Sequence, residues 1–371
     1  MKRKIMAVFG TRPEAIKMCP LIRELQGREG VLCRVCVTGQ HRELVAPILS
    51  LFDIQPDYDL AVMRPGQELF DVTEAVLERL REVLLLERPE LVLVHGDTTT
   101  TFAAALACFY LGIPVGHVEA GLRTYDLSAP FPEEWNRRAV GLIAAYHFAP
   151  TACARENLLQ EGVPAERIAV TGNTGLDTLR TTVQTAFSHP ILDWAGEDRL
   201  ILLTAHRRES LGEPMRRAFR GLRRVLEERQ DVRLVYPVHP NPAVRRVAKE
   251  ELGGCSRILL TEPLEVYDCH NLLARCYLVV TDSGGIQEEA AALRKPVLVL
   301  RDRTERQEGL DAGVLRLIGT AEGTVYRGLS ELLENPALYH AMATAPCPFG
   351  DGFASGRIAD WLVSWGEEAG A

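Results

Sequence analysis

The sequence predicts an α/β protein built from two doubly wound, Rossmann-like domains. Short apolar segments typical of buried parallel strands alternate with longer amphipathic segments typical of helices. A chain of 371 residues is too long for a single compact core. The alternating segments fall into two sets that join near the polar stretch 172–198, which gives each domain its own parallel sheet.

The first domain, expected over residues 1–172, holds six strand candidates. These are KIMAVF (4–9), LCRVCVT (32–38), LVLVH (91–95), PVGHVE (114–119), YHFAP (146–150) and RIAVTG (167–172). Helical periodicity predicts helices over 68–87 and 99–111. A C-terminal helix, residues 354–371, follows the Gly-rich turn of GDGFASGRIADWLVSW, and we expect it to pack back on this domain.

The second domain, expected over residues 173–353, repeats the pattern. Its strand candidates are RLILLTA (199–205), VRLVYPV (232–238), RILLT (257–261), YLVVTD (277–282) and PVLVL (296–300). The same periodicity predicts helices over 214–229 and 285–294.

Charge and hydropathy exclude several partner classes. The net charge is −8, so no excess of positive charge favours nucleic acid or an anionic membrane. The N-terminal MKRKIMAVFG has a basic head, but its apolar run is shorter than a signal peptide needs. No other segment is long and apolar enough to span a bilayer, so we expect a cytoplasmic protein.

The nine cysteines are scattered through apolar segments and odd in number, which predicts reduced, buried thiols. Cys33 and Cys36 form a CxxC, but within the strand candidate 32–38. A metal site would need a second pair and a loop. We interpret these two thiols as apolar filler and expect no metal.

Ligands of doubly wound sheets bind at the carboxyl ends of the strands. The segments that follow the strand candidates are rich in Gly, Arg, His and carboxylates: GTRPEAIK, TGQHRE, HGDTTT, HVEAGLR, TGNTGLD, TAHRRES, PVHPNP, TDSGGIQEE and LRDRTER. Loops that only turn the chain do not need such chemistry, so we expect a polar, charged cleft between the two domains.

The segment TDSGGIQEEA, residues 281–290, predicts an anion site at a helix start. Gly284 and Gly285 allow close approach of the backbone, and Ser283 can bind a phosphate oxygen. A plain helix capped by Ser283 explains these three residues equally well. Two glutamates are expected in the first helical turn, and Glu289 is a candidate ligand of ribose hydroxyls. A nucleotide is therefore predicted, but NAD is not, because no GxGxxG follows a strand.

Acids follow two strands of the first domain that we expect to be sheet neighbours. Asp97 follows the strand candidate 91–95, Glu119 ends the candidate 114–119, and Glu133 and Glu134 lie in SAPFPEEWNRR. Singly, each is as compatible with a structural role, such as a helix cap at Asp97, as with catalysis. Together with a nucleotide site, they indicate acid–base chemistry.

Cationic side chains also cluster after strands. His206 lies at a strand end beside Arg207 and Arg208, which favours contact with phosphate. Further candidates for the same phosphate are Arg12, Lys17 and Arg306. For Lys17, a solvated helix face is an equally good interpretation.

Taken together, these motifs resemble those of a known enzyme family. GTRPEAIKMCPL, TGQHRE, VHGDTTT, HVEAGLRT, PEEWNRR, TAHRRES, DSGGIQEEA, RDRTER and GDGFASGRI occur in the order seen in non-hydrolysing UDP-N-acetylglucosamine 2-epimerases. The chain resembles that family from about residue 5 to about residue 358. The resemblance implies the two-domain GT-B architecture with the active site in the interdomain cleft. It also implies interconversion of UDP-N-acetylglucosamine and UDP-N-acetylmannosamine without metal or nicotinamide, supplying N-acetylmannosamine units for cell-surface polysaccharide.

The reaction implied by the resemblance is elimination of UDP to 2-acetamidoglucal, followed by re-addition with a proton on the other face of C2. Its acid–base residues match Asp97, Glu119, Glu133 and His206, although their individual proton transfers stay unassigned. The positions that match binding of the phosphates and ribose are Arg12, Lys17, Arg137, His206, Ser283, Gly284, Gly285, Glu289 and Arg306.

The chain departs from the family pattern in two respects. Near the position of Cys269 the family usually has an aromatic residue, which packs on uracil. A thiol lacks that stacking surface, so uridine binding is expected to be weaker unless Tyr267 compensates. Many relatives bind a second UDP-N-acetylglucosamine as activator, and Gln40, Arg207 and His239 suit that site. Glu43 and Gly66 stand where amide and basic groups are expected.

Other functions compatible with the sequence are a hydrolysing relative that releases UDP and N-acetylmannosamine, a GT-B glycosyltransferase, and a catalytically silent nucleotide-sugar sensor. The three retained acids argue against the sensor, and GTRPE and PEE against the glycosyltransferase. The family is commonly homodimeric, and the apolar residues of helix 68–87 are compatible with an interface.

Overall fold

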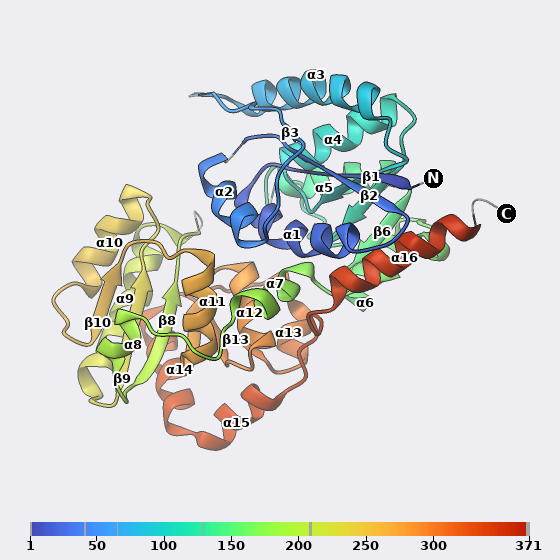
Figure 1. The fold of residues 1–371 in the computed structure, drawn as a ribbon. Coiled ribbons are helices and arrows are strands. Elements are labelled where there is room, and N and C mark those ends of the chain that lie inside the picture. Colours follow the sequence, from blue (N-terminus) through green and yellow to red (C-terminus); the bar gives the residue numbers. More distant parts are fainter. Residues whose placement is uncertain (1, 41, 65, 129, 208–209, 369–371) are drawn as a thin grey trace. The chain divides into compact units, whose positions relative to one another are not determined.

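The computed structural model describes residues 2–40, 42–64, 66–128, 130–207 and 210–368. The chain divides into two compact units, residues 1–178 with 350–371 (unit 1) and residues 179–349 (unit 2). Each unit has one fully parallel sheet with helices on both faces (Figure 1). The predicted fold class, two Rossmann-like α/β parts, is confirmed.

The sheet of unit 1 has the strand order β3-β2-β1-β4-β5-β6-β7. The strands are β1 (Arg3–Phe9), β2 (Val31–Val37), β3 (Tyr58–Asp59), β4 (Leu91–His95), β5 (Val115–Val118), β6 (Tyr146–Ala149) and β7 (Ile168–Val170). All six strand candidates are confirmed. The edge strand β3 was not predicted, because two residues are too few to show a hydrophobic pattern.

Two layers of helices enclose this sheet (Figure 1). The apolar faces of α3, α4 and α5 pack on one side with residues of β1, β4 and β5, whereas α1 packs beside α16. The helices of unit 1 are α1 (Arg12–Gln26), α2 (Arg42–Leu51), α3 (Leu69–Glu87), α4 (Thr99–Tyr110), α5 (Glu133–Ile143), α6 (Ala152–Gln160) and α16 (Ala354–Glu368), with a 3-10 turn at Ala165–Arg167 and with α7 (Thr174–Thr182) leading into unit 2.

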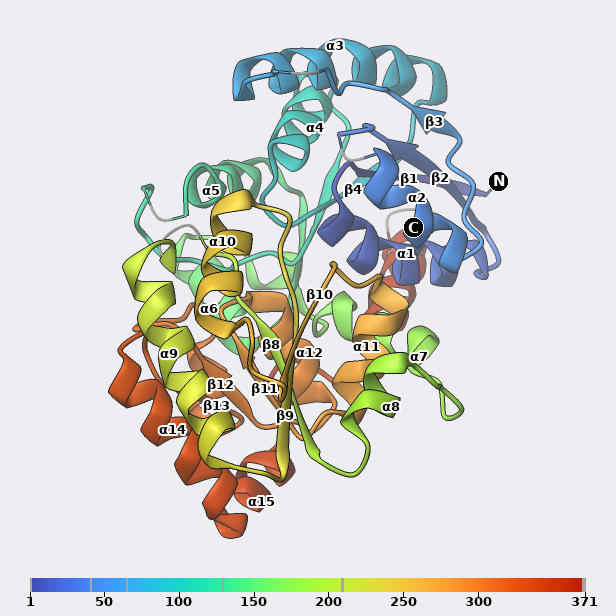
Figure 2. The same ribbon diagram turned by 90° about the vertical axis from the view of Figure 1, so that its left-hand side faces the viewer.

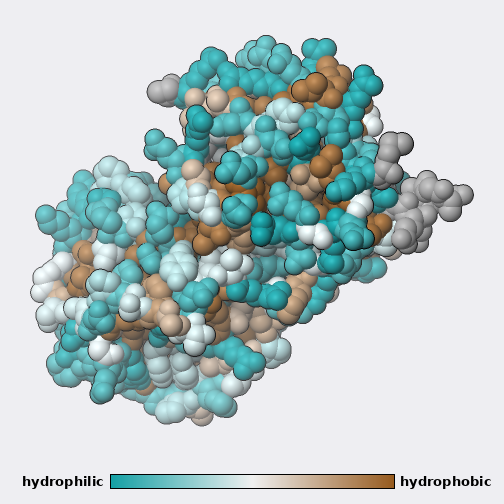
Figure 3. All heavy atoms as spheres, viewed as in Figure 1, coloured by the Kyte–Doolittle hydropathy of each residue, from teal (hydrophilic) through white to brown (hydrophobic). Residues whose placement is uncertain are grey.

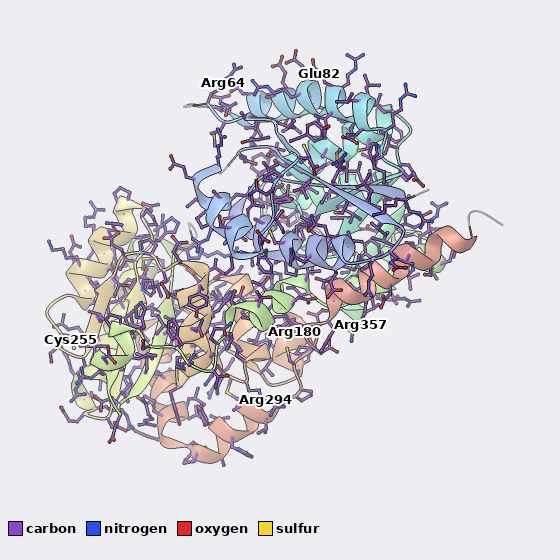
Figure 4. The ribbon with its side chains drawn as sticks, viewed as in Figure 1. Arg64, Glu82, Arg180, Cys255, Arg294 and Arg357 are labelled. Carbon is purple, nitrogen blue, oxygen red and sulfur yellow. The ribbon has the colours of Figure 1, made fainter. Side chains whose placement is uncertain are left out.

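The C-terminal helix α16 is fixed at its start by polar contacts. The Asp177 carboxylate accepts the backbone N–H groups of Ala354 (3.1 Å) and Ser355 (2.7 Å). Arg357, labelled in Figure 4, donates to Asp351 (2.6 Å) and to the backbone carbonyl of residue 171 (3.1 Å). These contacts hold α16 within unit 1.

The sheet of unit 2 has the order β10-β9-β8-β11-β12-β13. Its strands are β8 (Arg199–Thr204), β9 (Val232–Pro237), β10 (Ile258–Thr261), β11 (Leu278–Thr281), β12 (Val297–Val299) and β13 (Leu315–Leu317). Its helices are α8 (Pro190–Ala195), α9 (Glu213–Glu228), α10 (Pro242–Leu252), α11 (Val266–Arg275), α12 (Gly284–Ala292), α13 (Gln307–Asp311), α14 (Glu322–Glu334) and α15 (Pro336–Thr344). The short strand β13 was not predicted.

A core of unit 2 lies between the sheet and the helices α9, α10 and α14, which run side by side in Figure 2. Helix α9 shows why the sequence forms this layer, because Met215, Phe219, Leu222 and Leu226 recur at helical spacing and are buried. Among the residues that the structure describes, no helix combines the length and the apolar character needed to cross a membrane.

None of the nine cysteines, all of which the structure describes, forms a disulfide. Cys33 and Cys36 lie buried in β2, and burial raises the pKa of each thiol to about 12, so both stay protonated. The expectation that the thiols are buried is wrong for Cys153, which is exposed on α6.

Three histidines lie inside the sheet of unit 1. His95, His117 and His147 belong to the adjacent strands β4, β5 and β6 and are 3%, 0% and 1% exposed. Burial lowers their pKa values to about 4, 3 and 4. The folded state therefore keeps all three rings neutral at neutral pH.

We predict that the protein loses stability below pH 6.5. An unfolded histidine has a pKa near 6.5, so the unfolded chain binds more protons than the folded chain between pH 6.5 and pH 4. The stabilisation is complete above that window and is lost as the pH falls. By pH 5 the loss is about 2 kcal/mol for each buried histidine. Urea unfolding at pH 7.5 and at pH 5.0 measures this loss as a difference between two free energies of unfolding. His147→Phe removes one of the three histidines and should reduce that difference. An equal free energy of unfolding at both pH values would contradict the prediction.

Candidate functional site

The acids of unit 1 meet at the carboxyl edge of its sheet. Strands β4 and β5 pair in parallel, with His95 opposite Val118. Asp97 and Glu119 follow these strands, so the prediction that they stand on sheet neighbours is confirmed. The alternative role of Asp97 as a helix cap is wrong, because the Thr98 hydroxyl caps α4 by accepting the N–H of residue 101 (3.1 Å).

Glu119 is held in an unusual backbone conformation beside a cation. Its φ is +64°, a left-handed conformation that costs a non-glycine residue about 1–3 kcal/mol. Its carboxylate forms an ion pair with the Lys17 ammonium, and the His95 Nε2 lies 3.8 Å from its Oε2. The interpretation of Lys17 as a solvated helix residue is wrong, since its side chain is only 14% exposed.

Asp97 is surrounded by groups from α5. Its carboxylate forms an ion pair with Arg137, and its backbone carbonyl accepts the Asn136 amide (2.9 Å). Burial raises the pKa of the Asp97 carboxyl above its ordinary value, Arg137 opposes this rise, and the charges of Glu119 and Glu133 add to it. Glu133 is the first residue of α5, which places a third acid near this pair.

Glu134 has a different environment from Glu133. Its carboxylate is fully buried and accepts the backbone N–H groups of Thr124 and Tyr125, each at 3.0 Å. Arg137 lies 3.5 Å away. Glu134 therefore fixes the loop that precedes α5.

Glu14 is a site residue that the motif analysis missed. It is 1% exposed and accepts the N–H of Thr11 (2.8 Å) and the hydroxyls of Thr98 (2.9 Å) and Thr101 (3.1 Å). Glu14 thus links the start of α1, where Arg12 is the first residue, to the segment that follows Asp97. The Thr-Arg-Pro-Glu spacing of a capping box was the available signal.

The start of α12 in unit 2 has the features of an anion site. Within the described residues, the Ser283 side chain makes no capping hydrogen bond, so the plain capped helix is wrong as an explanation. The Arg306 guanidinium lies against Gly284, where a Cβ would come within 2.7 Å of its Cζ. The absence of a side chain at position 284 leaves room for this guanidinium beside the start of α12, where helical N–H groups can bind an anion.

The expectation of two glutamates in the first turn of α12 is wrong, because Glu288 and Glu289 are its fifth and sixth residues. The Glu289 Oε1 would lie 3.8 Å from a Cβ at Gly285. Its Oε2 lies 3.5 Å from the His270 Nε2, and the His270 Nδ1 is 2.8 Å from the Thr182 hydroxyl. Glu289 is thus oriented beside the helix start.

Two carboxylates hold Arg306 in place. Its Nε donates to Glu288 (2.8 Å), and its Nη1 pairs with Glu305. Glu305 also binds Arg301 (2.7 Å) and Arg207 (3.3 Å). Although burial opposes it, the three arginines lower the pKa of Glu305 to about 2. The carboxylate therefore stays ionised and fixes all three cations.

His206 follows β8 and is positioned by a buried aspartate. The Asp282 Oδ2 accepts the backbone N–H groups of His206 (2.8 Å) and Arg207 (2.9 Å), and its Oδ1 lies 3.6 Å from the His206 Nδ1. The His206 ring stacks on His239, with ring centroids 5.3 Å apart. Arg208 lies outside the described residues.

The residues considered for an activator occupy both units. In unit 1, Gln40 and Gly66 line a hollow of about 690 Å³ together with Met63 and Leu69. Glu43 is exposed on α2, whereas Arg207 and His239 belong to unit 2. The activator site stays a prediction.

Cys269 and Tyr267 both lie on α11. The Tyr267 ring meets Phe187 edge to face at 5.7 Å, and Phe187 stacks on His189 at 5.9 Å. An aromatic surface therefore exists on the same helix as the thiol. The structure describes no group of three or more His, Cys, Asp or Glu side chains, within the ranges given above, that could hold a metal ion.

Comparison with known proteins identifies the family. The family model described as UDP-N-acetylglucosamine 2-epimerase matches residues 23–363. The UDP-N-acetylglucosamine 2-epimerase of Bacillus subtilis (strain 168) is 54% identical over 362 residues, which cover 98% of this chain and 95% of the relative.

Solved structures of similar proteins support the same family. The UDP-GlcNAc 2-epimerase of Neisseria meningitidis, solved with bound UDP-GlcNAc, superimposes with a TM-score of 0.91 at 43% identity, covering 97% of this chain and 100% of that one. A glycotransferase of kitacinnamycin has the same fold at 14% identity, with a TM-score of 0.67 and coverages of 98% and 99%, in keeping with a GT-B architecture. The chain belongs to the UDP-N-acetylglucosamine 2-epimerase family.

Proposed function

We propose that this protein interconverts UDP-N-acetylglucosamine and UDP-N-acetylmannosamine by inverting C2 of the sugar, without net hydrolysis. The observation that carries the proposal is the pair of acids, Asp97 and Glu119, on neighbouring strand ends of a family member, each with a cation at its carboxylate. In this proposal the product supplies N-acetylmannosamine units for cell-surface polysaccharide.

The chemistry explains why the acids act together with a diphosphate site. The proton on C2 is not acidic, because the neighbouring C1 is an acetal carbon and no carbonyl activates it. Elimination of UDP across C1 and C2 breaks the C1–O bond and removes the C2 proton, which yields 2-acetamidoglucal. Re-addition of UDP to C1 with a proton delivered to the opposite face of C2 gives the epimer.

Residues of unit 1 would move the proton. Lys17 holds the Glu119 carboxyl group and Arg137 holds that of Asp97, and the pKa of Asp97, raised by burial, moves toward the range that acid–base catalysis near neutral pH uses. We assign Glu133 to the same acid–base group. Arg137 and Lys17 then serve to orient the two carboxyl groups rather than to bind phosphate directly.

Residues of unit 2 would bind UDP. The helix start at Ser283, Gly284 and Gly285 and the guanidinium of Arg306 would stabilise the leaving diphosphate. Glu289 would accept the ribose hydroxyls. We further propose that His206, which follows β8, binds the diphosphate. Arg12, the first residue of α1 in unit 1, is assigned to phosphate binding as well.

Proton NMR of the purified protein with UDP-N-acetylglucosamine in D2O tests the reaction. We expect a second anomeric signal from UDP-N-acetylmannosamine, entry of deuterium at C2, and little free UDP. The deuterium follows from proton removal at C2 and exchange of the acid with solvent. Free UDP accumulating with N-acetylmannosamine would instead identify a hydrolysing enzyme, and binding without any change would identify a sensor.

Asp97→Asn and Glu119→Gln should each lower turnover by at least about 10²-fold, because positioned acid–base groups contribute about 10²–10⁴-fold. Binding of UDP, followed by calorimetry, should change little. Glu161→Gln is the matched control, since Glu161 pairs with Arg123 in the same unit without contacting either acid. Turnover near the wild-type level in both variants would refute the assignment.

We also propose that the protein is a homodimer formed through α3, α4 and α5. Apolar side chains are exposed on these adjacent helices, among them Phe70, Leu86, Phe109 and Leu142. Figure 3 shows hydrophobic surface among hydrophilic groups over α3. An exposed apolar area on three packed helices is typical of a protein–protein interface.

Leu86→Glu and Phe109→Glu should convert the dimer to a monomer, because each places a charge in an apolar interface. Light scattering coupled to size exclusion measures the mass. Leu44→Glu, at an exposed leucine of α2, should leave the dimer intact. A wild-type protein with a mass near the 41.1 kDa of one chain would exclude the dimer.

A further inference from the structure

Gly96, the residue before Asp97, is held by β5 through both of its backbone polar groups. Gly96 has a φ of +66°, and its N–H donates to the Val118 carbonyl (2.9 Å). Its carbonyl oxygen lies 2.7 Å from the His117 Nε2. Both contacts come from the strand that Glu119 follows, so β5 positions the backbone that leads into Asp97.

The His117 contact fixes a single tautomer. A carbonyl oxygen only accepts hydrogen bonds, so the Nε2 must carry the proton and donate. The Nδ1 is then a buried acceptor, and it has no hydrogen-bond partner among the residues that the structure describes. Such a nitrogen destabilises the fold, and an apolar side chain of similar size would avoid it. The Nε2–H therefore requires an explanation beyond packing.

His117 does not act on the substrate itself. The side chain is 0% exposed, and burial lowers its pKa to about 3, so the ring stays neutral while the protein is folded. It can neither contact a ligand nor exchange a proton at neutral pH. What it can do is orient the peptide to which it donates.

We propose that His117 is a positioning residue whose Nε2–H sets the plane of the Gly96–Asp97 peptide and so directs the Asp97 carboxyl toward the Glu119 side of the sheet edge. The Glu119 carboxylate reaches the turn that precedes Asp97, since a Cβ at Gly96 would lie 3.4 Å from the Glu119 Oε1. Asn136 and Arg137 of α5 contact Asp97 directly. His117 of β5 contacts the carbonyl of the residue before Asp97. The inference rests on the proposed acid–base role of Asp97.

His147 offers a matched comparison. It stands opposite His117 on β6, is equally buried, and also has an unpartnered Nδ1 within the described part of the chain. Its backbone contact is with Ala144, which follows α5, rather than with the Asp97 turn. A purely structural role would make the two histidines equivalent.

The experiment compares His117→Leu, His117→Gln and His117→Asn with His147→Leu. In His117→Leu the donor is lost, and kcat should fall by about a hundredfold with KM nearly unchanged, since a displacement of about 1 Å has that effect. Gln places an amide N–H near the Nε2 position and should restore kcat to within about tenfold of wild type. Asn is too short to place an N–H there, so His117→Asn should not restore kcat. His147→Leu should leave kcat unchanged.

Equal losses of kcat in His117→Leu and His147→Leu would overturn the proposal, as would a folded His117→Gln no more active than His117→Asn. If the leucine variants do not fold, the comparison of Gln with Asn decides. Crystal structures of the variants give a readout independent of activity: we expect a rotated Gly96–Asp97 peptide in His117→Asn and an unchanged one in His117→Gln. Failure of the wild type to epimerise would count against the proposed function, whereas an unmoved peptide would count against the positioning role.

Discussion

The parallel pairing of β4 with β5 is the constraint on which the site in unit 1 depends. Because the strands run side by side, their carboxyl ends bring Asp97 and Glu119 to one edge of the sheet. Two carboxylates at one edge repel each other unless cations offset the charge. Lys17 and Arg137 supply these cations from helices α1 and α5. The surrounding structure also holds Glu119 in a left-handed backbone conformation, which costs a non-glycine residue about 1–3 kcal/mol.

Buried carboxylates hold the loops of both units. Glu14, Glu134 and Asp282 are each at most 1% exposed and accept backbone N–H groups of a loop that follows a strand. A hydrogen bond to a charged group contributes about 1.5–3 kcal/mol, and a loop held by two such bonds does not move freely. This explains how residues on connecting segments keep the fixed positions that acid–base chemistry requires.

The sequence predicts the interior strands and helices well because parallel strands buried on both faces are continuous apolar runs. It cannot show β3 or β13, which are too short for a pattern. Strand-end acids such as Asp97 are visible because the signal is local. The role of Glu14 is not, since Thr98 and Thr101 lie more than eighty residues away along the chain. Lys17 was ambiguous for the same reason, because only the fold brings it to Glu119.

The cations of unit 2 face the opposite electrostatic problem from the acids of unit 1. Arg207, Arg301 and Arg306 would repel each other if they were unpaired, and Glu305 holds all three. Preformed cations lose little conformational entropy when an anion binds. Glu305 also reduces their combined positive charge, which weakens the attraction for a diphosphate. Under the proposed function, the enzyme would retain the diphosphate while the glycal is present and release it afterwards. A cluster of arginines partly neutralised by an internal carboxylate is suited to both requirements, whereas three unpaired arginines would favour retention alone.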